Sequence, residues 1–372
     1  MVKRIGDLYG NVFDMRNLEL AHRNARKGKG WYAEVKNLEK DLHGGLKNIQ
    51  HLLINHEYVT SDYEIFIKCE GNKERKIYKL PYYPDRIVQW ALMQVVSPYI
   101  ERHLIRDTYS AIPNRGIHDG LRRVQDAMYW HKDDCRYCLK FDVRHYYQNI
   151  VHDILFMQYC RMFKDEELLW LIHEIINSIN TFDEEDEWEM VLADLEVIYS
   201  CGVPIGNYFS QWSGNFYLSV FDHWLKEVIG IKYYYRYMDD CVILHGDKDF
   251  LHELRFEIEK YLWQVLHLRL KENWQIFPSY VRGVDYLGYR VFDGYTLLRK
   301  KTIKNIKDNC KYIGKKTRNG CLMSYSDFCS LNSHLGWTEQ ANCFRFNQKH
   351  IYPFEENASL FYRDVIWMGD LK

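Results

Sequence analysis

Residues 232–246, KYYYRYMDDCVILHG, decide the fold of this chain. Two apolar, aromatic-rich runs flank a short acidic break, a pattern typical of a β-hairpin with Asp239 and Asp240 at its tip. Because adjacent strand residues point to opposite faces, one carboxylate can reach a metal ion while the other supports it or binds a second ion. Two carboxylates at one tip repel each other unless a cation lies between them. Aspartate is equally common in solvated turns, so the rest of the chain has to separate the two interpretations.

Length and composition indicate a globular protein with a substantial core. The 372 residues are enough for two or three packed subdomains, and a hydrophobic content of 47% argues against general disorder. The net charge of −1 requires any nucleic-acid binding to come from local basic surfaces. The cysteines form no framework, and the single CxxC at Cys135 and Cys138 is a weak zinc signal. No apolar leader or membrane span is recognised, so we expect a cytoplasmic protein without membrane contact.

A second carboxylate position lies in residues 137–150, YCLKFDVRHYYQNI. Alternation of polar and apolar residues predicts a strand with Asp142 near its C-terminal end. Beside the hairpin, Asp142 would complete a three-carboxylate cage with Asp239 and Asp240. Such hard oxygen ligands suit Mg²⁺, which shares its coordination sphere with substrate phosphates. Two ions of this kind can bind an attacking 3′-oxygen, an α-phosphate and a leaving pyrophosphate.

Three segments in the first third of the chain carry basic residues. A helix over residues 17–30 ends in RNARKGKG, which is either a solvated face or a grip for phosphate. Residues 63–80 predict a hairpin whose second strand carries Arg75; it either folds over a triphosphate or is an exposed edge protected by its charges. Arg115 lies in a turn before a helix that starts near His118, and helix N-termini attract anions.

The segment 299–318, RKKTIKNIKDNCKYIGKKTR, contains nine basic residues and one acidic residue. Five of its lysines recur at spacings of 4, 3, 4 and 4, which places them on one face of a helix, with isoleucines on another. We expect the apolar face to pack and the basic face to follow a nucleic-acid phosphate backbone. The five lysines are Lys300, Lys304, Lys307, Lys311 and Lys315.

The remaining segments are mainly helical in pattern. Residues 202–227 predict a Gly/Pro loop that enters a helix, and the acidic run 183–189 has the composition of a solvated insertion. Residues 270–277 predict a strand that contains Lys271 near its start, a position typical of an exposed strand lysine. Apolar residues at helical spacing predict further helices over 38–56, 85–103, 165–180 and 248–268.

In their order along the chain, several of these stretches resemble the conserved blocks of bacterial reverse transcriptases. The resemblance covers roughly residues 73–337. The blocks are YPDRIVQWAL and RGIHDGL for the fingers, FDVRHYYQNI, GVPIGNYFSQ and YMDD for the catalytic region, and GVDYLGYRV for the primer grip.

The resemblance implies an α/β (α+β) right-hand polymerase with fingers, an antiparallel palm sheet and a small helical thumb. The implied boundaries are 1–136 for the N-terminal region and fingers, 137–292 for the palm, and 293–372 for the thumb and tail. A finger-side helical insertion is expected within the palm at about 153–200. Too few residues follow the implied thumb for an added nuclease domain, so we expect none.

The resemblance also implies a role for each matching residue. Asp142, Asp239 and Asp240 would bind two Mg²⁺ ions, with Mn²⁺ as the alternative, and the Val143 carbonyl would assist. Tyr147 matches the steric gate that disfavours a ribose 2′-OH. Lys271 lies near the position where the family often has a lysine that protonates pyrophosphate; the alternative is an exposed strand lysine. The residues expected to contact the incoming nucleotide or the template base are Arg75, Arg115, Ile205, Gly206 and Gln211.

Two positions depart from the common pattern of the family. Ile205 stands where many members have Gln, and Ile112 stands where many have a finger Arg. Both replace polar nucleotide contacts with apolar ones, so we expect looser nucleotide positioning and lower fidelity, with Arg115 as a partial substitute.

The pattern IGNxxSQ, the LLRKK segment and SHLGWTEQAN are most similar to reverse transcriptases of diversity-generating retroelements. This subtype implies copying of a template RNA into cDNA from dNTPs, as an RNA–DNA duplex, with a small basic accessory protein. Reverse transcriptases of antiviral defence share much of the pattern; these make DNA from an associated noncoding RNA or without a template. A catalytically idle RNA-binding module is the alternative of another class, and the three carboxylates argue against it.

Overall fold

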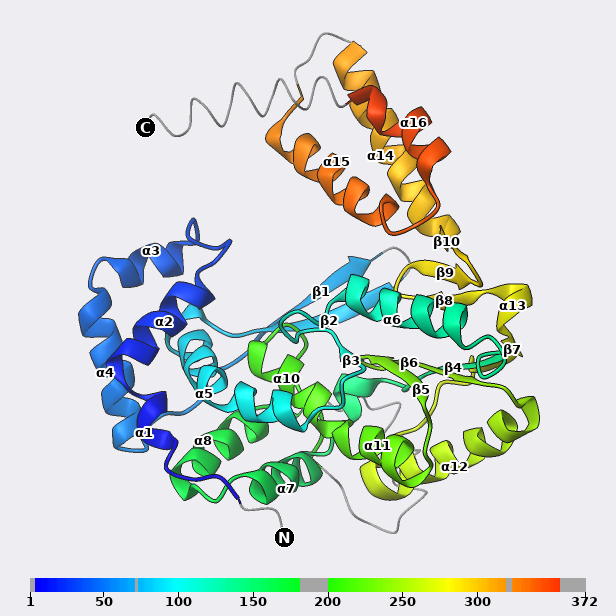
Figure 1. Cartoon of the computed structure of the whole chain (residues 1–372). Coiled ribbons are helices and arrows are strands. Elements are labelled where there is room, and N and C mark those ends of the chain that lie inside the picture. Colours follow the sequence, from blue (N-terminus) through cyan, green and yellow to red (C-terminus); the bar gives the residue numbers. More distant parts are fainter. Residues whose placement is uncertain (1–3, 71–72, 181–199, 319–322, 355–372) are drawn as a thin grey trace. The chain divides into compact units, whose positions relative to one another are not determined.

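The computed structural model describes residues 4–70, 73–180, 200–318 and 323–354, while the side chains of residues 70 and 73–75 are outside this description (Figure 1). The chain divides into two compact units. The first comprises Met1–Pro113, Phe141–Cys241 and Leu254–Trp274. The second comprises Asn114–Lys140, Val242–Glu253 and Gln275–Lys372.

The N-terminal part of the first unit is a group of helices packed around α5 (Ile87–His103). The core side of α5 is apolar, with Val88, Leu92 and Val96 fully buried. A π-helical turn, η1 (Tyr82–Arg86), precedes α5 and leads the chain into it. The helices that join this group are α1 (Tyr9–Val12), α2 (Met15–Ala25), α3 (Ala33–Glu39) and α4 (Leu42–Ile54).

The predicted basic hairpin is confirmed as β1 (Glu64–Glu70) and β2 (Lys73–Lys79). The strands pair antiparallel, with Glu64 opposite Lys79 and Lys68 opposite Arg75. Lys79 forms an ion pair with Glu64 across the hairpin, with Nζ 3.0 Å from Oε2.

A five-stranded sheet carries the carboxylates, in the order β3-β5-β6-β4-β7. Its strands are β3 (Thr108–Tyr109), β4 (Tyr137–Asp142), β5 (Tyr233–Tyr237), β6 (Asp240–His245) and β7 (Gln275–Pro278). The palm sheet was expected to be antiparallel, and β4 does pair antiparallel with β7, but β3 pairs parallel with β5. The parallel strand is only two residues long, so it changes one edge and not the plan of the sheet.

The middle of the chain forms further helices of the first unit. The Gly/Pro loop enters α10 (Tyr208–Tyr217), in which Trp212 and Phe216 are buried, as the apolar pattern predicts. Tyr159 stacks against Phe209 of α10 at a centroid distance of 6.0 Å. The other elements of this region are η2 (Tyr146–Asn149), α7 (His152–Met162), α8 (Glu166–Asn177), α11 (Ser219–His223) and η3 (Trp224–Val228). Helix α12 (Lys248–Leu266) crosses the boundary between the units.

The second unit combines a small antiparallel sheet with helices. The sheet has the order β10-β9-β8, and α6 (Ile117–Trp130) packs against β9. Among the described residues after β10 the helices are α14 (Lys300–Arg318), α15 (Tyr325–Thr338) and α16 (Phe344–His350), in the region where the resemblance implies a small helical thumb. The remaining elements are α13 (Ser279–Arg282), β8 (Val284–Tyr286), β9 (Tyr289–Phe292), β10 (Tyr295–Leu298) and η4 (Tyr352–Phe354).

Several predicted elements differ from the structure. The helix expected over residues 17–30 ends at Ala25, so the basic residues 26–29 follow it in a turn. The single helix expected over residues 38–56 is replaced by α3 and α4, because the Asp41 side chain accepts a hydrogen bond from Gly44 N and starts a new helix there. The strand expected over 270–277 is shortened to β7, since Leu270 forms only an isolated bridge with Val143. The acidic run 183–189 and most of the aromatic tail lie outside the described residues.

The mixed helix and strand architecture of the predicted polymerase fold is thus confirmed. None of the helices within the described ranges combines the length and the apolar character needed to cross a lipid bilayer.

Candidate active site

The predicted hairpin is confirmed, and its turn lies beside the end of β4. Asp239 occupies the turn between β5 and β6, Asp240 is the first residue of β6, and Asp142 is the last residue of β4. The Val143 amide donates a hydrogen bond of 3.4 Å to the Asp239 carbonyl. Met238, which precedes the turn aspartate, has a φ of 53°, a left-handed conformation that is uncommon for a residue with a Cβ atom. The backbone therefore brings Asp142 and Asp239 together.

A short extended segment, residues 269–271, runs antiparallel to residues 142–144. Arg144 N donates to Arg269 O at 2.8 Å, and Lys271 N donates to Asp142 O at 2.9 Å. This register brings the Lys271 ammonium group to the carboxylates, with Nζ 3.6 Å from Asp239 Oδ2. The Lys271 ammonium group therefore lies beside the Asp239 carboxylate, and its catalytic role stays a prediction.

Burial and neighbouring charges shift the pKa of Asp239 in opposite directions. Burial raises the pKa of Asp239, the Lys271 ammonium opposes this increase, and the Asp142 carboxylate adds to it by repulsion. One oxygen of Asp240, Oδ1, is also buried. A divalent cation would relieve the repulsion between the carboxylates, which is the condition that the sequence predicted.

A buried ion pair, which the sequence analysis missed, holds the hairpin turn. Arg236 of β5 and Asp222 of α11 are both fully buried, and the Arg236 Nη2 atom lies 2.5 Å from Asp222 Oδ2. Burial lowers the pKa of Arg236, but the Asp222 carboxylate raises it above its ordinary value overall. Arg236 Nη1 also donates to the Met238 carbonyl at 3.0 Å, and Nη2 donates to the Asn215 carbonyl at 3.1 Å. The guanidinium therefore fixes the residue immediately before Asp239.

The position of Arg236 within an aromatic run was a usable signal. A charged residue inside a strand that is otherwise apolar has to find a partner when the strand is buried on both faces. The partner itself could not be identified, because Asp222 lies in a helix fourteen residues earlier and meets Arg236 only in the folded chain.

Tyr147 lies between α10 and the hairpin turn. A Cβ atom on Gly214 would lie 3.2 Å from its ring, so the small residue allows the ring to pack directly on the helix. The Tyr147 hydroxyl donates to Met238 Sδ at 3.4 Å. Burial raises the pKa of Tyr147, and the charge of Asp239 raises it further, so the hydroxyl is neutral at pH 7.

The predicted nucleotide contacts are only partly brought together. Gly206 and Gln211 line one pocket of the first unit, and Gly206 has a φ of 110°, which favours glycine. Ile205 is half-buried beside them. Arg115 belongs to the second unit, and the side chain of Arg75 lies outside the described residues. Ile112 is 6% exposed and therefore packs in the core.

The site offers a metal ion oxygen atoms as ligands. Over the described ranges, no group of three or more His, Cys, Asp or Glu side chains is arranged so that it could hold a metal ion. The approach of Asp142 to Asp239, with the backbone oxygens beside them, supplies the donor type that Mg²⁺ prefers. The three-carboxylate cage with Asp240 stays a prediction.

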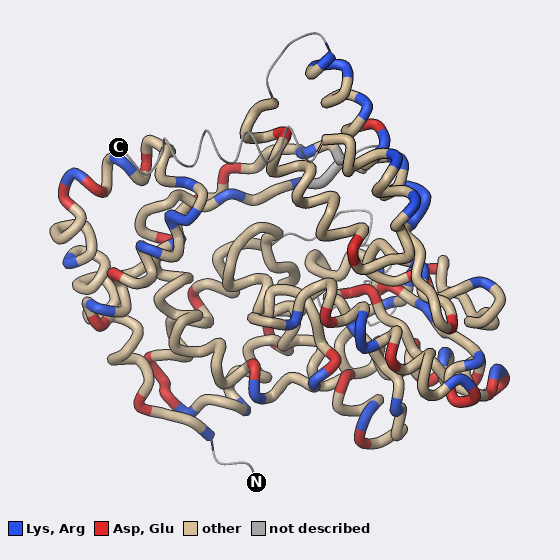
Figure 2. The backbone as a smooth tube through the Cα atoms, turned by 45° about the horizontal axis from the view of Figure 1, so that its top comes forward, with Lys and Arg blue, Asp and Glu red and all other residues tan. Residues whose placement is uncertain are grey.

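The five lysines of α14 are exposed, as the periodicity predicts. Basic positions recur along the backbone of this helix (Figure 2). Ile306, Cys310 and Ile313 form the buried face of the same helix. Lys307 Nζ lies 5.9 Å from the centroid of the Phe346 ring, and across the described part of the chain no acidic side chain forms an ion pair with any of the five.

The chain is similar to one curated protein and to solved structures of telomerases. Protein YkfC of Escherichia coli (strain K12) is 24% identical over 296 residues, which cover 68% of this chain and 70% of that protein. Structures of telomerase from Candida tropicalis and Candida albicans match with TM-scores of 0.48 and 0.47 and identities of 12% and 10%. They cover 73% and 70% of this chain, and this chain covers 53% and 51% of theirs. This chain thus spans about half the length of those telomerases.

The family comparison extends over more than half of the chain. Residues 67–291 match the family described as reverse transcriptase (RNA-dependent DNA polymerase). The matched region includes β4, the hairpin of β5 and β6, and the residues that surround Asp142 and Asp239. The chain therefore belongs to the reverse transcriptase family, whose members are RNA-directed DNA polymerases.

Proposed function

We propose that this protein copies a template RNA into DNA from dNTPs, with Asp142, Asp239 and Asp240 as the carboxylates that hold its divalent cations. The observation that carries the proposal is the junction of β4 with the hairpin turn, where the Val143 amide binds the Asp239 carbonyl. That junction brings two acidic residues together from segments about a hundred positions apart in the sequence.

Two Mg²⁺ ions, or Mn²⁺ in their place, would supply charge neutralisation for the transferred phosphate. Side chains of the protein would donate a proton and select the sugar. Lys271 Nζ, 3.6 Å from Asp239 Oδ2, would offer a proton to the leaving pyrophosphate. The Tyr147 ring, packed on Gly214, would exclude a ribose 2′-OH and so favour dNTPs.

We further propose low fidelity, as in a diversity-generating retroelement. Ile205 supports this, because an apolar side chain cannot donate the hydrogen bond that Gln would offer to a nucleotide. Ile112 lends no support, since its side chain belongs to the core. A basic accessory protein or a structured noncoding RNA would complement a chain whose net charge is −1.

The test is extension of a DNA primer on an RNA template with Mg²⁺ and dNTPs, with the locus-encoded RNA added in a parallel reaction. We expect extension by the wild type and a loss of at least ~10³-fold in Asp239→Asn and Asp142→Asn. The matched control is Asp62→Asn, an exposed aspartate that should leave extension unchanged. Equal extension by Asp239→Asn would contradict the proposed role of the turn.

A further inference from the structure

A buried histidine joins the start of α7 to the Gly/Pro loop that begins near residue 202. His152 is the first residue of α7 and is 1% exposed. Its backbone N–H donates to Ser200 O at 3.0 Å, and Gly202 N donates to Ile150 O at 2.8 Å. These two bonds align the chain before α7 antiparallel with the start of the loop. The alignment places the His152 ring beside Gly202.

The two ring nitrogens of His152 have different partners. The Gly202 carbonyl oxygen can only accept, so Nε2 carries the proton and donates to it at 2.7 Å. Nδ1 then accepts from Ser200 Oγ at 3.0 Å, and the Asn177 side-chain amide lies 3.2 Å from the same nitrogen. Burial is the largest influence on the pKa of His152 and lowers it overall, against the hydrogen bond to Gly202. The ring is therefore a neutral donor to the loop at pH 7.

The peptide unit between Gly202 and Val203 is held on both sides. Its carbonyl oxygen accepts from His152, and its N–H donates to the Tyr147 carbonyl at 2.8 Å. The oxygen and the hydrogen of a trans peptide point in opposite directions, so His152 and Tyr147 lie on opposite sides of this unit. Gly202 has a φ of 96° and, as a glycine, permits many conformations. The two hydrogen bonds therefore decide which direction the peptide takes.

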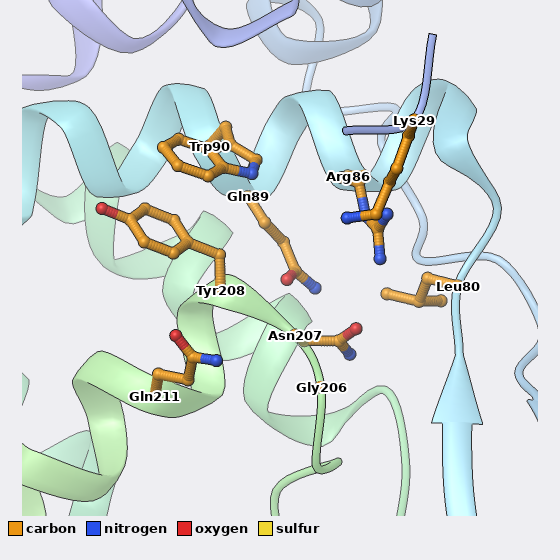
Figure 3. Close-up of a pocket in the computed structure, with 9 residues that line it drawn as sticks. All are labelled: Lys29, Leu80, Arg86, Gln89, Trp90, Gly206, Asn207, Tyr208 and Gln211. Carbon is orange, nitrogen blue, oxygen red and sulfur yellow. The ribbon is translucent and has the colours of Figure 1, made fainter. Parts of the chain in front are cut away.

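Tyr147 links this peptide to the candidate active site. Its ring packs on Gly214, and its hydroxyl donates to Met238 Sδ in the hairpin turn at 3.4 Å. The loop itself continues through Gly206 into α10, where it lines a pocket (Figure 3). A rotation of the peptide after Gly202 would therefore move the backbone of Tyr147 and the entry to α10 together.

We propose that His152 is a positioning residue for sugar selection. It holds the peptide after Gly202, and through that peptide the Tyr147 ring, where the ring excludes a ribose 2′-OH. The inference rests on the proposed copying of RNA into DNA and on the proposed role of Tyr147. A misplacement of ~1 Å can change a rate by ~10²-fold, so a small shift of the ring would be enough to admit the ribose oxygen.

The test is single-nucleotide primer extension on an RNA template, with kcat/KM measured for a dNTP and for the matching rNTP. The wild type should prefer the dNTP. His152→Phe keeps an aromatic ring but has no donor for the Gly202 carbonyl, so the preference should fall roughly ten-fold. A general loss of folded enzyme would lower both values equally and leave their ratio unchanged.

Two amide variants separate the roles of the two ring nitrogens. The side-chain amide of His152→Gln reaches about as far as Nε2 and can donate to Gly202, so the preference should be retained. The amide of His152→Asn reaches only as far as Nδ1, so the preference should fall as in His152→Phe. This comparison decides the proposal even where the Phe variant fails to fold.

The matched control removes another buried histidine of the first unit. His22 is 2% exposed, and its Nδ1 lies 2.9 Å from the Tyr82 hydroxyl among the N-terminal helices. His22→Phe should keep the preference for the dNTP, because this ring holds no part of the loop.

A double variant tests whether His152 acts through Tyr147. Tyr147→Ala removes the ring and should itself lose most of the preference. Adding His152→Phe should lower the preference no further, because both losses have the same cause. Losses that multiply in the double variant would overturn the proposal, as would an unchanged preference in folded His152→Asn.

Hydrogen exchange of the Val203 amide measures the hold on the peptide without any enzyme activity. It should be faster in His152→Asn than in the wild type and unchanged in His22→Phe. An unchanged rate in His152→Asn would contradict the hold itself. Faster exchange in a protein that extends no primer would reject the copying function, and sugar selection with it, but leave the hold of His152 on the loop standing.

Discussion

Arg236 connects the core of the first unit to the turn that carries Asp239. Its guanidinium binds Asp222 through three hydrogen bonds and reaches the Met238 carbonyl with a further one. Tyr234 donates to the same carboxylate at 2.7 Å. A fully buried ion pair adds little net stability, because both charges lose their hydration. Its main effect here is to fix one conformation of the turn, in which Met238 is left-handed. Arg236 is thus a positioning residue.

Removing one partner of this pair should be costly, and removing both should be less so. We expect Asp222→Leu or Arg236→Met alone to lower the free energy of unfolding by about 3–5 kcal/mol, since each leaves a buried charge unpaired. The double variant should be more stable than either single variant. Urea denaturation measures all three.

We expect the double variant to regain stability without regaining primer-extension activity. The double variant still lacks the donor to the Met238 carbonyl, so its kcat in primer extension should stay low while its KM for dNTPs changes little. Additive losses of stability, or a double variant with full kcat, would show that Arg236 has no role in holding the turn.

Ile205 offers a second test at the scale of one residue. It is half-buried and directly precedes Gly206, which lines the pocket at the start of α10. Ile205→Gln should lower the misincorporation rate several-fold by adding a polar contact to the nucleotide. Sequencing of the cDNA products measures this, with Ile205→Leu as the apolar control. An unchanged error spectrum in Ile205→Gln would contradict the fidelity proposal.

At the scale of elements, α14 and α15 of the second unit are joined by one carboxylate. Asp327 lies in the first turn of α15 and forms a capping box with Ser324. The same carboxylate accepts from Lys316 of α14 at 2.6 Å. Its burial raises the pKa of Asp327, but the hydrogen bonds from Lys316 and Ser324 lower it below the ordinary value overall.

The pKa of Asp327 fixes the pH dependence of this link. A lowered folded-state pKa gives stability that is present above the unfolded value of about 3.9 and is lost as the pH falls through the folded value. We expect Asp327→Asn to destabilise α15 by about 1–2 kcal/mol at pH 7, with the difference from wild type closing below about pH 4. Hydrogen exchange of the α15 amides measures it. Asp308→Asn, exposed on α14, is the control, and an equal effect of that variant would contradict the assignment.

Elements were predictable where the pattern is local. The hairpin of β5 and β6, the strand that ends at Asp142, and the exposed lysine face of α14 all follow from periodicity within one segment. The interactions that support the site were not predictable, because they join distant segments. The approach of Lys271 depends on a backbone register, and the pairing of Arg236 with Asp222 depends on helix packing.

Across the whole molecule, charge is close to balanced, with 50 basic and 51 acidic residues. Long-range attraction cannot therefore bring nucleic acid to the protein, and binding must depend on local basic surfaces. The lysine face of α14 is the clearest of these, because its five lysines are exposed on one side of a helix whose other side is buried.

This division predicts where the salt dependence of binding arises. The triple variant Lys304→Gln, Lys307→Gln and Lys311→Gln should lower the slope of log K against log salt by roughly 2–3 for an RNA–DNA duplex, because each contact releases about one counterion. Anisotropy titrations between low and moderate salt measure the slope. A control triple variant with the same change in net charge uses exposed lysines elsewhere, at Lys36, Lys47 and Lys260. If only net charge mattered, both triple variants would lose affinity equally, and the lysine face of α14 would have no special role. A loss confined to the first triple variant would establish that face as the duplex-binding surface of a nearly neutral protein.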